Sequence, residues 1–302
     1  MTVKPQLRVL ISGASGFIGT ELVRQLERDG HTVLKLVRSA PTNANEFNWA
    51  PSAHMVDSAA LDSVDAIINL SGASTGRLPW TKKYRREILD SRIDTTKTLT
   101  EAMAHATTPP KTLLNASAVG FYGDRPAEKL NEESSKGEGF LADVVDTWEM
   151  TAEVAPVGTR VVTFRTGLVV ARGGAFTPLL PVTKAGLGAR MGTGGQHWPW
   201  ISLYDEAAAI RHLLTSSMSG SVNLVGPTPA TADRVTRYLA KAMHRPYFFS
   251  IPEKAILLAL GEAGHDLLLS SQKVHPHRLL ADGFSFRHPT VESAIDAMLE
   301  TL

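Results

Sequence analysis

Three glycines between a short apolar run and an amphipathic helical stretch constrain the fold of this chain more than any other feature. Gly13, Gly16 and Gly19 follow the strand-length run 8–12 and open the helical pattern 16–29. Glycine permits the tight turn, lets the backbone approach a diphosphate and brings the helix close to the strand. The phosphates would meet free N–H groups at the positive end of the helix dipole. The run predicts a dinucleotide site; the alternative is a glycine-rich turn without a ligand.

Strand and helix patterns alternate along the first part of the chain. Apolar runs of strand length lie at 8–12, 32–37, 65–70, 112–116 and 160–164, and helical patterns lie at 81–105, 140–155, 202–217 and 231–244. Continuous apolar strands that alternate with helices are typical of a parallel sheet covered on both faces. We therefore expect an α/β fold with a Rossmann-type, doubly wound parallel sheet.

The length of 302 residues lies at the upper edge of what one core usually serves, so we expect a second lobe. Residues 1–170 are predicted to form the dinucleotide-binding domain, with its sheet completed by later segments. Residues 171–302 are predicted to form a smaller substrate lobe, helical from about residue 250. The Gly- and Pro-rich stretch 172–196 is interpreted as a functional loop or lid, and 124–139 as a polar loop.

Charge and composition exclude several classes of partner. The formal net charge is +1, so we expect neither nucleic acid nor an anionic membrane surface as a partner. The chain has no cysteine, and no apolar run approaches the ~18 residues of a membrane helix. We expect a cytoplasmic monomer or homodimer that acts on a small molecule. His275 and His277 lack acidic or thiol partners nearby, so no metal site is predicted.

The end of the second predicted strand indicates which dinucleotide binds. NAD sites usually place a carboxylate there, about 20 residues past the glycines, to hold the ribose 2′-hydroxyl. This chain instead has Arg38, followed by Ser39. A guanidinium suits a 2′-phosphate by a charge-assisted pairing. The sequence therefore predicts NADP(H) as the cofactor, unless Arg38 is only a solvated surface charge.

Motifs along almost the whole chain resemble an extended short-chain dehydrogenase/reductase, of the atypical subgroup described as nucleoside-diphosphate-sugar epimerases. The matching stretches, in the expected order, are 13–19, 36–38, 65–73, 91–96, 116–123, 148–149, 165–168, 194–196, 200–205 and 272–286. This order is far more specific than any single motif.

The resemblance implies where the cofactor and the reacting groups lie. It places the following residues at the cofactor: Gly13, Ser15, Gly16, Phe17, Ile18, Gly19, Leu70, Ser71 and Gly72. It places Ser117 by the nicotinamide and Tyr122 in the loop above. The implied activity is that of an NADP(H)-dependent epimerase or oxidoreductase on a small polar substrate, a nucleotide sugar being one candidate.

The acid/base pair of working short-chain dehydrogenases is absent. In Tyr-x-x-x-Lys the tyrosine transfers a proton, and the lysine lowers the pKa of that tyrosine. The helix expected at 140–155 has Phe140 with Val144, or Leu141 with Val145, at these positions. None of the five tyrosines is followed by a lysine four residues later. A non-catalytic NADP(H)-binding sensor or scaffold is therefore the alternative function.

Other side chains are candidates for the missing chemistry. Tyr122 and Ser117 are the predicted substitutes; the alternatives are a tyrosine that packs beside the cofactor and a hydroxyl that satisfies the strand end. Glu149 is interpreted as a solvated or capping residue. Gln196 and Trp200 are predicted to bind substrate by hydrogen bonding and stacking, with a hydrophobic anchor for the lobe as the alternative.

Overall fold

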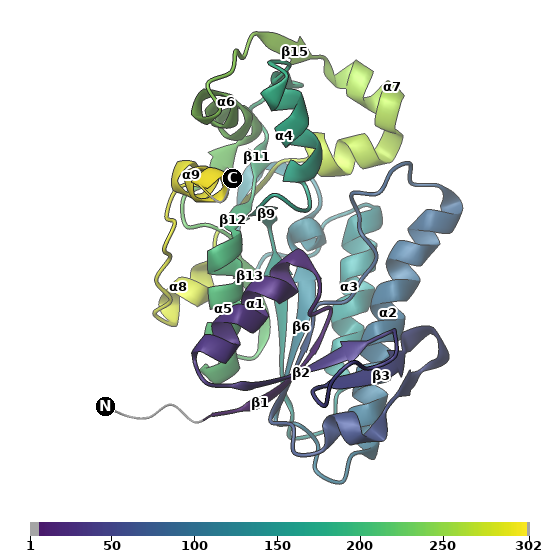
Figure 1. The fold of residues 1–302 in the computed structure, drawn as a ribbon. Helices are drawn as coiled ribbons and strands as arrows, with labels where there is room; N and C mark the ends of the chain where they lie inside the picture. The colour runs from purple at the N-terminus through teal and green to yellow at the C-terminus, as the bar shows by residue number, and fades with distance from the viewer. Residues whose placement is uncertain (1–5, 301–302) are drawn as a thin grey trace.

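An eight-stranded sheet organises the computed structural model, which describes residues 6–300 (Figure 1). The strand order is β13-β8-β6-β5-β1-β2-β3-β4, parallel apart from the antiparallel pair β3–β4. The bounds are β1 Arg8–Ser12, β2 Thr32–Val37, β3 Glu46–Ala50, β4 Met55–Val56, β5 Ala66–Asn69, β6 Thr112–Ala118, β8 Arg160–Thr166 and β13 Gly220–Leu224. The predicted Rossmann-type fold class is confirmed.

The strand order reverses at β1. The chain runs outward from β1 to β2 and β3, and then returns to β5 on the other side of β1. In register, Ser12 at the end of β1 pairs with Leu36 in β2 and with Asn69 in β5. Ligands of open α/β sheets bind beyond the carboxyl ends of the strands at such a reversal.

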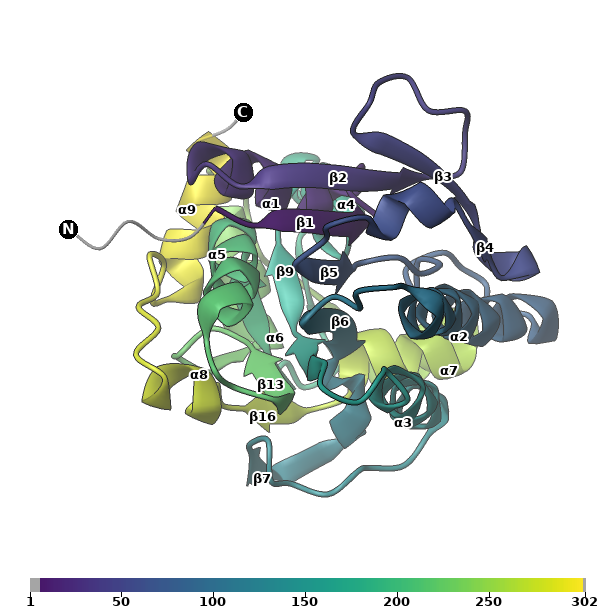
Figure 2. The same cartoon turned by 90° about the horizontal axis from the view of Figure 1, so that it is seen from below.

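Helices cover both faces of the sheet (Figure 2). On one face lie α1, Phe17–Arg28, and α5, Leu203–Thr215; on the other lie α2, Lys82–His105, and α3, Phe140–Glu153. The helical spacing of Leu22 and Leu26 directs both side chains of α1 into the core, where they are fully buried with Val9 and Ile11. The sheet is therefore buried on both sides, as its apolar strands require.

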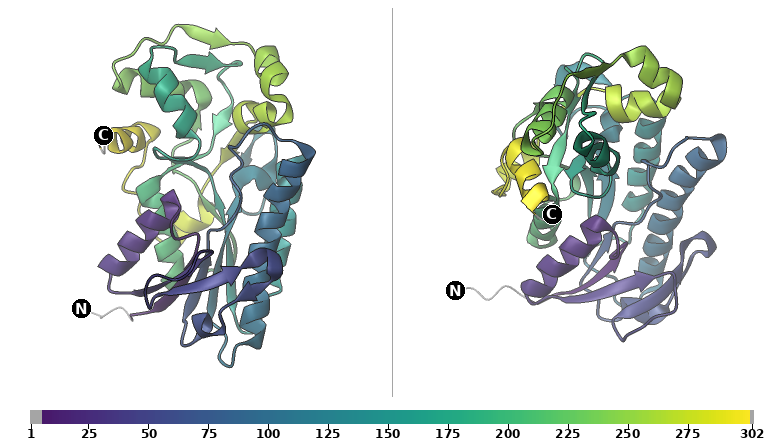
Figure 3. Two further views of the ribbon diagram at one scale, coloured as in Figure 1. Left: turned by 45° about the vertical axis from the view of Figure 1, so that its right-hand side comes forward. Right: turned by 45° about the horizontal axis from the view of Figure 1, so that its top comes forward.

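A second lobe lies beyond the carboxyl ends of the strands (Figure 3). Its helices are α4 Phe176–Lys184, α6 Ala232–Ala242, α7 Glu253–Gly264 and α9 Val291–Glu300, whereas the short helix α8, His277–Ala281, packs against β13 at the edge of the main sheet. Short strands connect them: β9 Leu168–Val170, β10 Ala189–Met191, β11 His197–Trp198, β12 Trp200–Ser202, β14 Ala230–Thr231 and β15 Phe249–Ile251. The lobe has its own core, in which Phe176, Val235 and Ile295 are buried.

Two predicted loops contain regular structure instead. Within 124–139, β7 (Arg125–Leu130) pairs with the distant β16 (Gln272–Val274). Within 172–196, α4 and β10 replace the expected open loop. The expected irregular chain was wrong in both stretches for the same reason, because glycine, proline and charge were taken as signs of it; a lid role of 172–196 stays a prediction. In residues 6–300, no helix is long and apolar enough to cross a membrane.

Candidate functional site

The glycine turn after β1 is as tight as the fingerprint requires. Gly13 has a φ of +74°, and a Cβ on it would lie 3.0 Å from the Leu70 carbonyl. A Cβ on Gly19 would lie 2.3 Å from the Gly13 oxygen. Gly16 precedes α1, and within residues 6–300 no side chain caps this helix. The first turn of α1 therefore presents backbone N–H groups to an anion.

The remaining residues of the predicted cofactor site lie around this turn. Ser15 and Phe17 are exposed, and Ile18 is half-buried. The Phe17 ring lies against the chain at Gly173, where an added Cβ would come within 3.1 Å of the ring. Arg38 is exposed at the end of β2, and it makes no hydrogen bond or ion pair with any other described residue. Its guanidinium is thus available to a ligand.

A buried hydrogen-bond network fixes the strand end beside the turn. The Asn69 side-chain oxygen accepts from the Ser12 hydroxyl at 2.6 Å, and its amide donates to the Asn115 oxygen at 2.7 Å. The Ser71 N–H donates to the same Asn69 oxygen at 3.3 Å. The loop that carries Leu70, Ser71 and Gly72 is therefore held next to Gly13.

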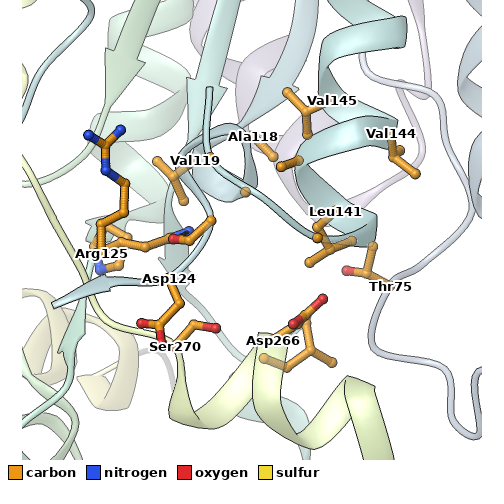
Figure 4. A pocket seen from close by; sticks show the side chains of 18 of the residues that line it. Thr75, Ala118, Val119, Asp124, Arg125, Leu141, Val144, Val145, Asp266 and Ser270 are labelled. Carbon is orange, nitrogen blue, oxygen red and sulfur yellow. Dashed lines mark hydrogen bonds between the residues drawn. The ribbon is translucent and has the colours of Figure 1, made fainter. Parts of the chain in front are cut away.

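A cavity of about 860 Å³ opens at the carboxyl ends of β6 and β8 (Figure 4). In Figure 4, Leu141 from α3 and Asp266 from the turn η4 (His265–Leu269) face each other across it. Its wall combines residues from the sheet, from α3 and from the second lobe. They include Thr75, Arg92, Ala118, Val119, Gly120, Leu141, Val144, Val145, Thr166, Trp198, Pro199, Glu262, His265 and Asp266.

Helix α3 decides between the two alignments of the missing acid/base pair. Leu141 and Val145 both line the cavity, and of the other alignment Val144 lines it but Phe140 does not. Phe140 instead packs edge-on against Trp80, with ring centroids 5.5 Å apart. Leu141 and Val145 therefore occupy the places of the tyrosine and lysine, and neither side chain carries a transferable proton.

The structure corrects the predicted position of Ser117. Successive residues of a strand point to opposite faces, and the residue of β6 that lines the cavity is Ala118. The Ser117 hydroxyl is buried and donates to Glu149 at 2.5 Å. Ser117 is thus placed to hold Glu149 rather than a reacting ligand.

Tyr122 is fully buried in the turn η3, Val119–Tyr122. Its hydroxyl donates to the Asn223 side-chain oxygen at 2.8 Å and accepts from Arg165 at 3.0 Å. Burial raises the pKa of this phenol, although Arg165 opposes the shift. Tyr122 is not among the described residues that line the cavity, so the structure does not bring its hydroxyl to a ligand there, and its place above the nicotinamide stays a prediction.

Ser117 and Tyr122 meet the same buried ion pair. Arg165 donates to both carboxylate oxygens of Glu149, at 2.8 and 2.7 Å. The two side chains are only 5% and 9% exposed, so Glu149 is not the solvated or capping residue that was predicted. A bidentate pair in this place holds α3 against β8, beneath the cavity.

The two predicted substrate residues do not meet in the main cavity. Gln196 is buried and donates to the Met191 and Leu268 carbonyls, and it lines a separate hollow of about 320 Å³. Trp200 is 1% exposed and packs so closely that a Cβ on Gly226 would lie 2.6 Å from its ring. The structure thus corrects the placement of Trp200, which is a hydrophobic anchor.

Two residues at the cavity escaped the sequence analysis. Thr166, at the end of β8, lines the cavity and donates at 2.7 Å to Glu206 of α5. Glu206 is 0% exposed, and burial raises its pKa to about 8. Arg92 of α2 also lines the cavity, and burial lowers its pKa to about 10. The one sequence feature that could have indicated a buried carboxylate is the position of Glu206 directly before the three alanines 207–209 of α5.

The chain matches a family model over most of its length. The model is the NAD dependent epimerase/dehydratase family, and it matches residues 9–226. This chain belongs to that family. A second model, a domain of unknown function named DUF1731, matches residues 251–298. The predicted family is confirmed.

Relatives and solved structures agree with this family. An epimerase family protein of Mycobacterium tuberculosis is 40% identical over 290 residues, which cover 95% of this chain and 96% of that protein. The human epimerase family protein SDR39U1, crystallised with NADPH, is 32% identical with a TM-score of 0.91, covering 98% of this chain and 100% of the other. A nucleoside-diphosphate sugar epimerase from Corynebacterium glutamicum is 31% identical with a TM-score of 0.80; the match covers 98% of this chain and 58% of that one.

Proposed function

We propose that this epimerase-family chain binds NADP(H) and transfers hydride between the nicotinamide and a small polar substrate, as an oxidoreductase or epimerase. The observation that carries the proposal is the position of the 860 Å³ cavity. The cavity lies at the carboxyl ends of β6 and β8 and reaches Thr75, in the loop that follows β5. A cavity in this place has room for a substrate beside a cofactor bound at the glycine turn.

The choice of NADP(H) rests on Arg38. The turn from Gly13 to Gly19 would hold the diphosphate, and the free guanidinium of Arg38 would pair with the 2′-phosphate. The SDR39U1 structure, which contains NADPH, supports the same choice. When bound, the cofactor supplies or accepts the hydride.

The proton must come from a group other than the usual tyrosine. Thr166 lines the cavity, and Glu206 behind it is largely neutral at pH 7 because burial raises its pKa to about 8. In the structure the Thr166 hydroxyl donates to Glu206. When Glu206 is protonated on the oxygen that faces Thr166, this hydrogen bond reverses, and the carboxyl group donates to the Thr166 oxygen. The Thr166 hydroxyl hydrogen is then free for an acceptor in the cavity, so this pair can pass a proton to a substrate oxygen.

A second candidate function is an NADP(H) sensor or scaffold without turnover. Leu141 and Val145 favour it, because both places of the usual acid/base pair are apolar. Removal of general acid/base catalysis typically costs about 10²- to 10⁴-fold in rate. A protein that only reports cofactor binding would not need that contribution.

Mixing the protein with NADPH and a panel of carbonyl compounds and sugar nucleotides separates the two functions. Nicotinamide absorbance and product identity are both followed, because an epimerase returns its hydride and shows no net absorbance change. We expect turnover that falls about tenfold or more in Thr166→Val and Glu206→Gln. The matched control is Tyr122→Phe, which removes a buried hydroxyl away from the cavity. Tight NADPH binding without product across the panel would favour the sensor.

A further inference from the structure

Arg92 places a cation in the cavity wall without an anionic partner. One terminal nitrogen, Nη1, donates to the Ala73 carbonyl at 3.1 Å and to the Ile88 carbonyl at 2.9 Å. In the part of the chain that the structure describes, Nε and Nη2 have no hydrogen-bond acceptor. The side chain is half-buried, and its guanidinium lies 5.0 Å from the centre of the Trp148 ring.

A guanidinium in this environment carries an energetic cost that a ligand can offset. Burial lowers the pKa of Arg92 to about 10, so the group still carries its charge at pH 7. A buried charge is costly unless an opposite charge and hydrogen bonds compensate it. The two carbonyls and the Trp148 ring compensate the charge only in part.

The other arginine and lysine of the cavity wall are neutralised within the chain. Arg125 pairs with Glu128, and Lys136 pairs with Asp143 at 2.6 Å. Among the described residues that line the cavity, Arg92 is thus the one arginine or lysine without a carboxylate. The wall also carries four carboxylates, of which Glu262 pairs with Arg85 and Asp124 and Asp266 lie beside His265; the fourth is Glu138. Among the arginine and lysine side chains of the wall, the unpaired positive charge is therefore local to Arg92.

We propose that Arg92 binds the anionic group, a carboxylate or a phosphate, of the ligand that occupies the cavity. The edge formed by Nε and Nη2 matches two oxygens of such a group. A Cβ on Gly72 would lie 3.4 Å from the Arg92 guanidinium carbon, so the anion would bind beside the loop next to the cofactor turn. The assignment rests on the proposed function and extends it, because it specifies a negatively charged substrate.

Calorimetry with unreactive probes tests the assignment without turnover. NADPH-loaded protein is titrated with inorganic phosphate, UDP and succinate, and with sucrose as the neutral probe. We expect at least one anion to bind better than sucrose, and Arg92→Gln to weaken that anion by roughly 10- to 100-fold. Arg92→Lys keeps the positive charge but lacks the two parallel N–H donors of the guanidinium, so we expect an intermediate loss of anion affinity. The probe that binds distinguishes carboxylate from phosphate.

The matched control is Arg86→Gln, which removes an exposed arginine from the same helix and should leave anion binding unchanged. Thermal unfolding shows whether each variant is folded. If Arg92→Gln does not fold, Arg92→Lys is used for the binding comparison instead. Equal anion affinity in the native protein and the variants, or no anion that binds better than sucrose, would overturn the assignment. A matching loss of NADPH affinity would assign Arg92 to the cofactor instead. Anion binding through Arg92 without NADPH binding would contradict only the proposed function.

Discussion

The carboxyl group of Glu206 is buried, and burial disfavours its charged form. The side chain is 0% exposed, and Oε2 has no hydrogen-bond partner in residues 6–300. Burial raises its pKa from 4.5 to about 8, so between these values the folded chain holds a proton that the unfolded chain has lost. Stability should therefore fall as pH rises through this window, by at most about 1.4 kcal/mol per pH unit for one group.

Glu206→Gln should remove this dependence, because an amide has no charged form to bury. We expect the variant to gain stability relative to the native chain as pH rises from about 5 to about 8. Urea unfolding midpoints across that range measure the difference. The exposed Glu133→Gln is the control and should track the native chain at every pH. A constant difference between Glu206→Gln and the native chain would show that Glu206 is ionised throughout.

Arg38 should set the preference between the two nicotinamide dinucleotides. It is exposed at the end of β2 and makes no ion pair with the described residues, so none of their carboxylates competes with a 2′-phosphate for its guanidinium. We expect Arg38→Ala to weaken NADPH binding about tenfold or more while NADH binding changes little. Calorimetry with both cofactors measures the ratio, and Arg28→Ala, at the far end of α1, is the control. Equal affinities of the native chain for the two cofactors would refute the role.

At the scale of elements, two glycines of the turn between β1 and α1 are expected to have different roles. Gly19 should matter for stability, and Gly16 for cofactor binding. A Cβ on Gly19 would lie 2.3 Å from the Gly13 oxygen, and backbone atoms cannot move away cheaply. A Cβ on Gly16 would lie 3.3 Å from the same oxygen, at an exposed position. Gly19→Ala should therefore lower the free energy of unfolding, whereas Gly16→Ala should mainly obstruct the diphosphate.

Urea unfolding and NADPH calorimetry on both variants check this contrast. We expect Gly19→Ala to lose about 2 kcal/mol or more of stability, and Gly16→Ala to stay within about 1 kcal/mol while its NADPH affinity falls tenfold or more. Equal stability losses in the two variants would mean that the close approach of α1 to β1 does not depend on Gly19.

The elements that the sequence predicted well are those fixed by nearby residues. The glycine turn, the apolar strands and the helices of the first half all depend on contacts within one strand–helix unit. Strand β7 was missed because its residues are charged and its partner β16 lies far along the chain. The choice between Ser117 and Ala118 was also out of reach, since the pleat fixes only that they face opposite ways. Which face meets the cavity depends on the second lobe.

At the scale of the whole molecule, the second half of the chain completes the first. Strand β13 pairs with β8 at the edge of the sheet, and α5 lies beside α1 on one of its faces. The α5 side chains Ile210 and Leu213 are fully buried in the same core as Leu22. A cut after residue 170, the predicted domain boundary, would therefore expose the part of this sheet face that α5 covers.

We expect a fragment of residues 1–170 to lack a cooperative unfolding transition, because it loses β13 and the α5 cover at once. A fragment of residues 1–226 keeps both, and it contains the segment 9–226 that matches the family model. It should unfold cooperatively, although its exposed lobe surface lowers its midpoint below that of the full chain. Circular dichroism in urea compares the two fragments under one condition. Cooperative unfolding of the shorter fragment, with a midpoint equal to that of the longer one, would support residue 170 as a domain boundary.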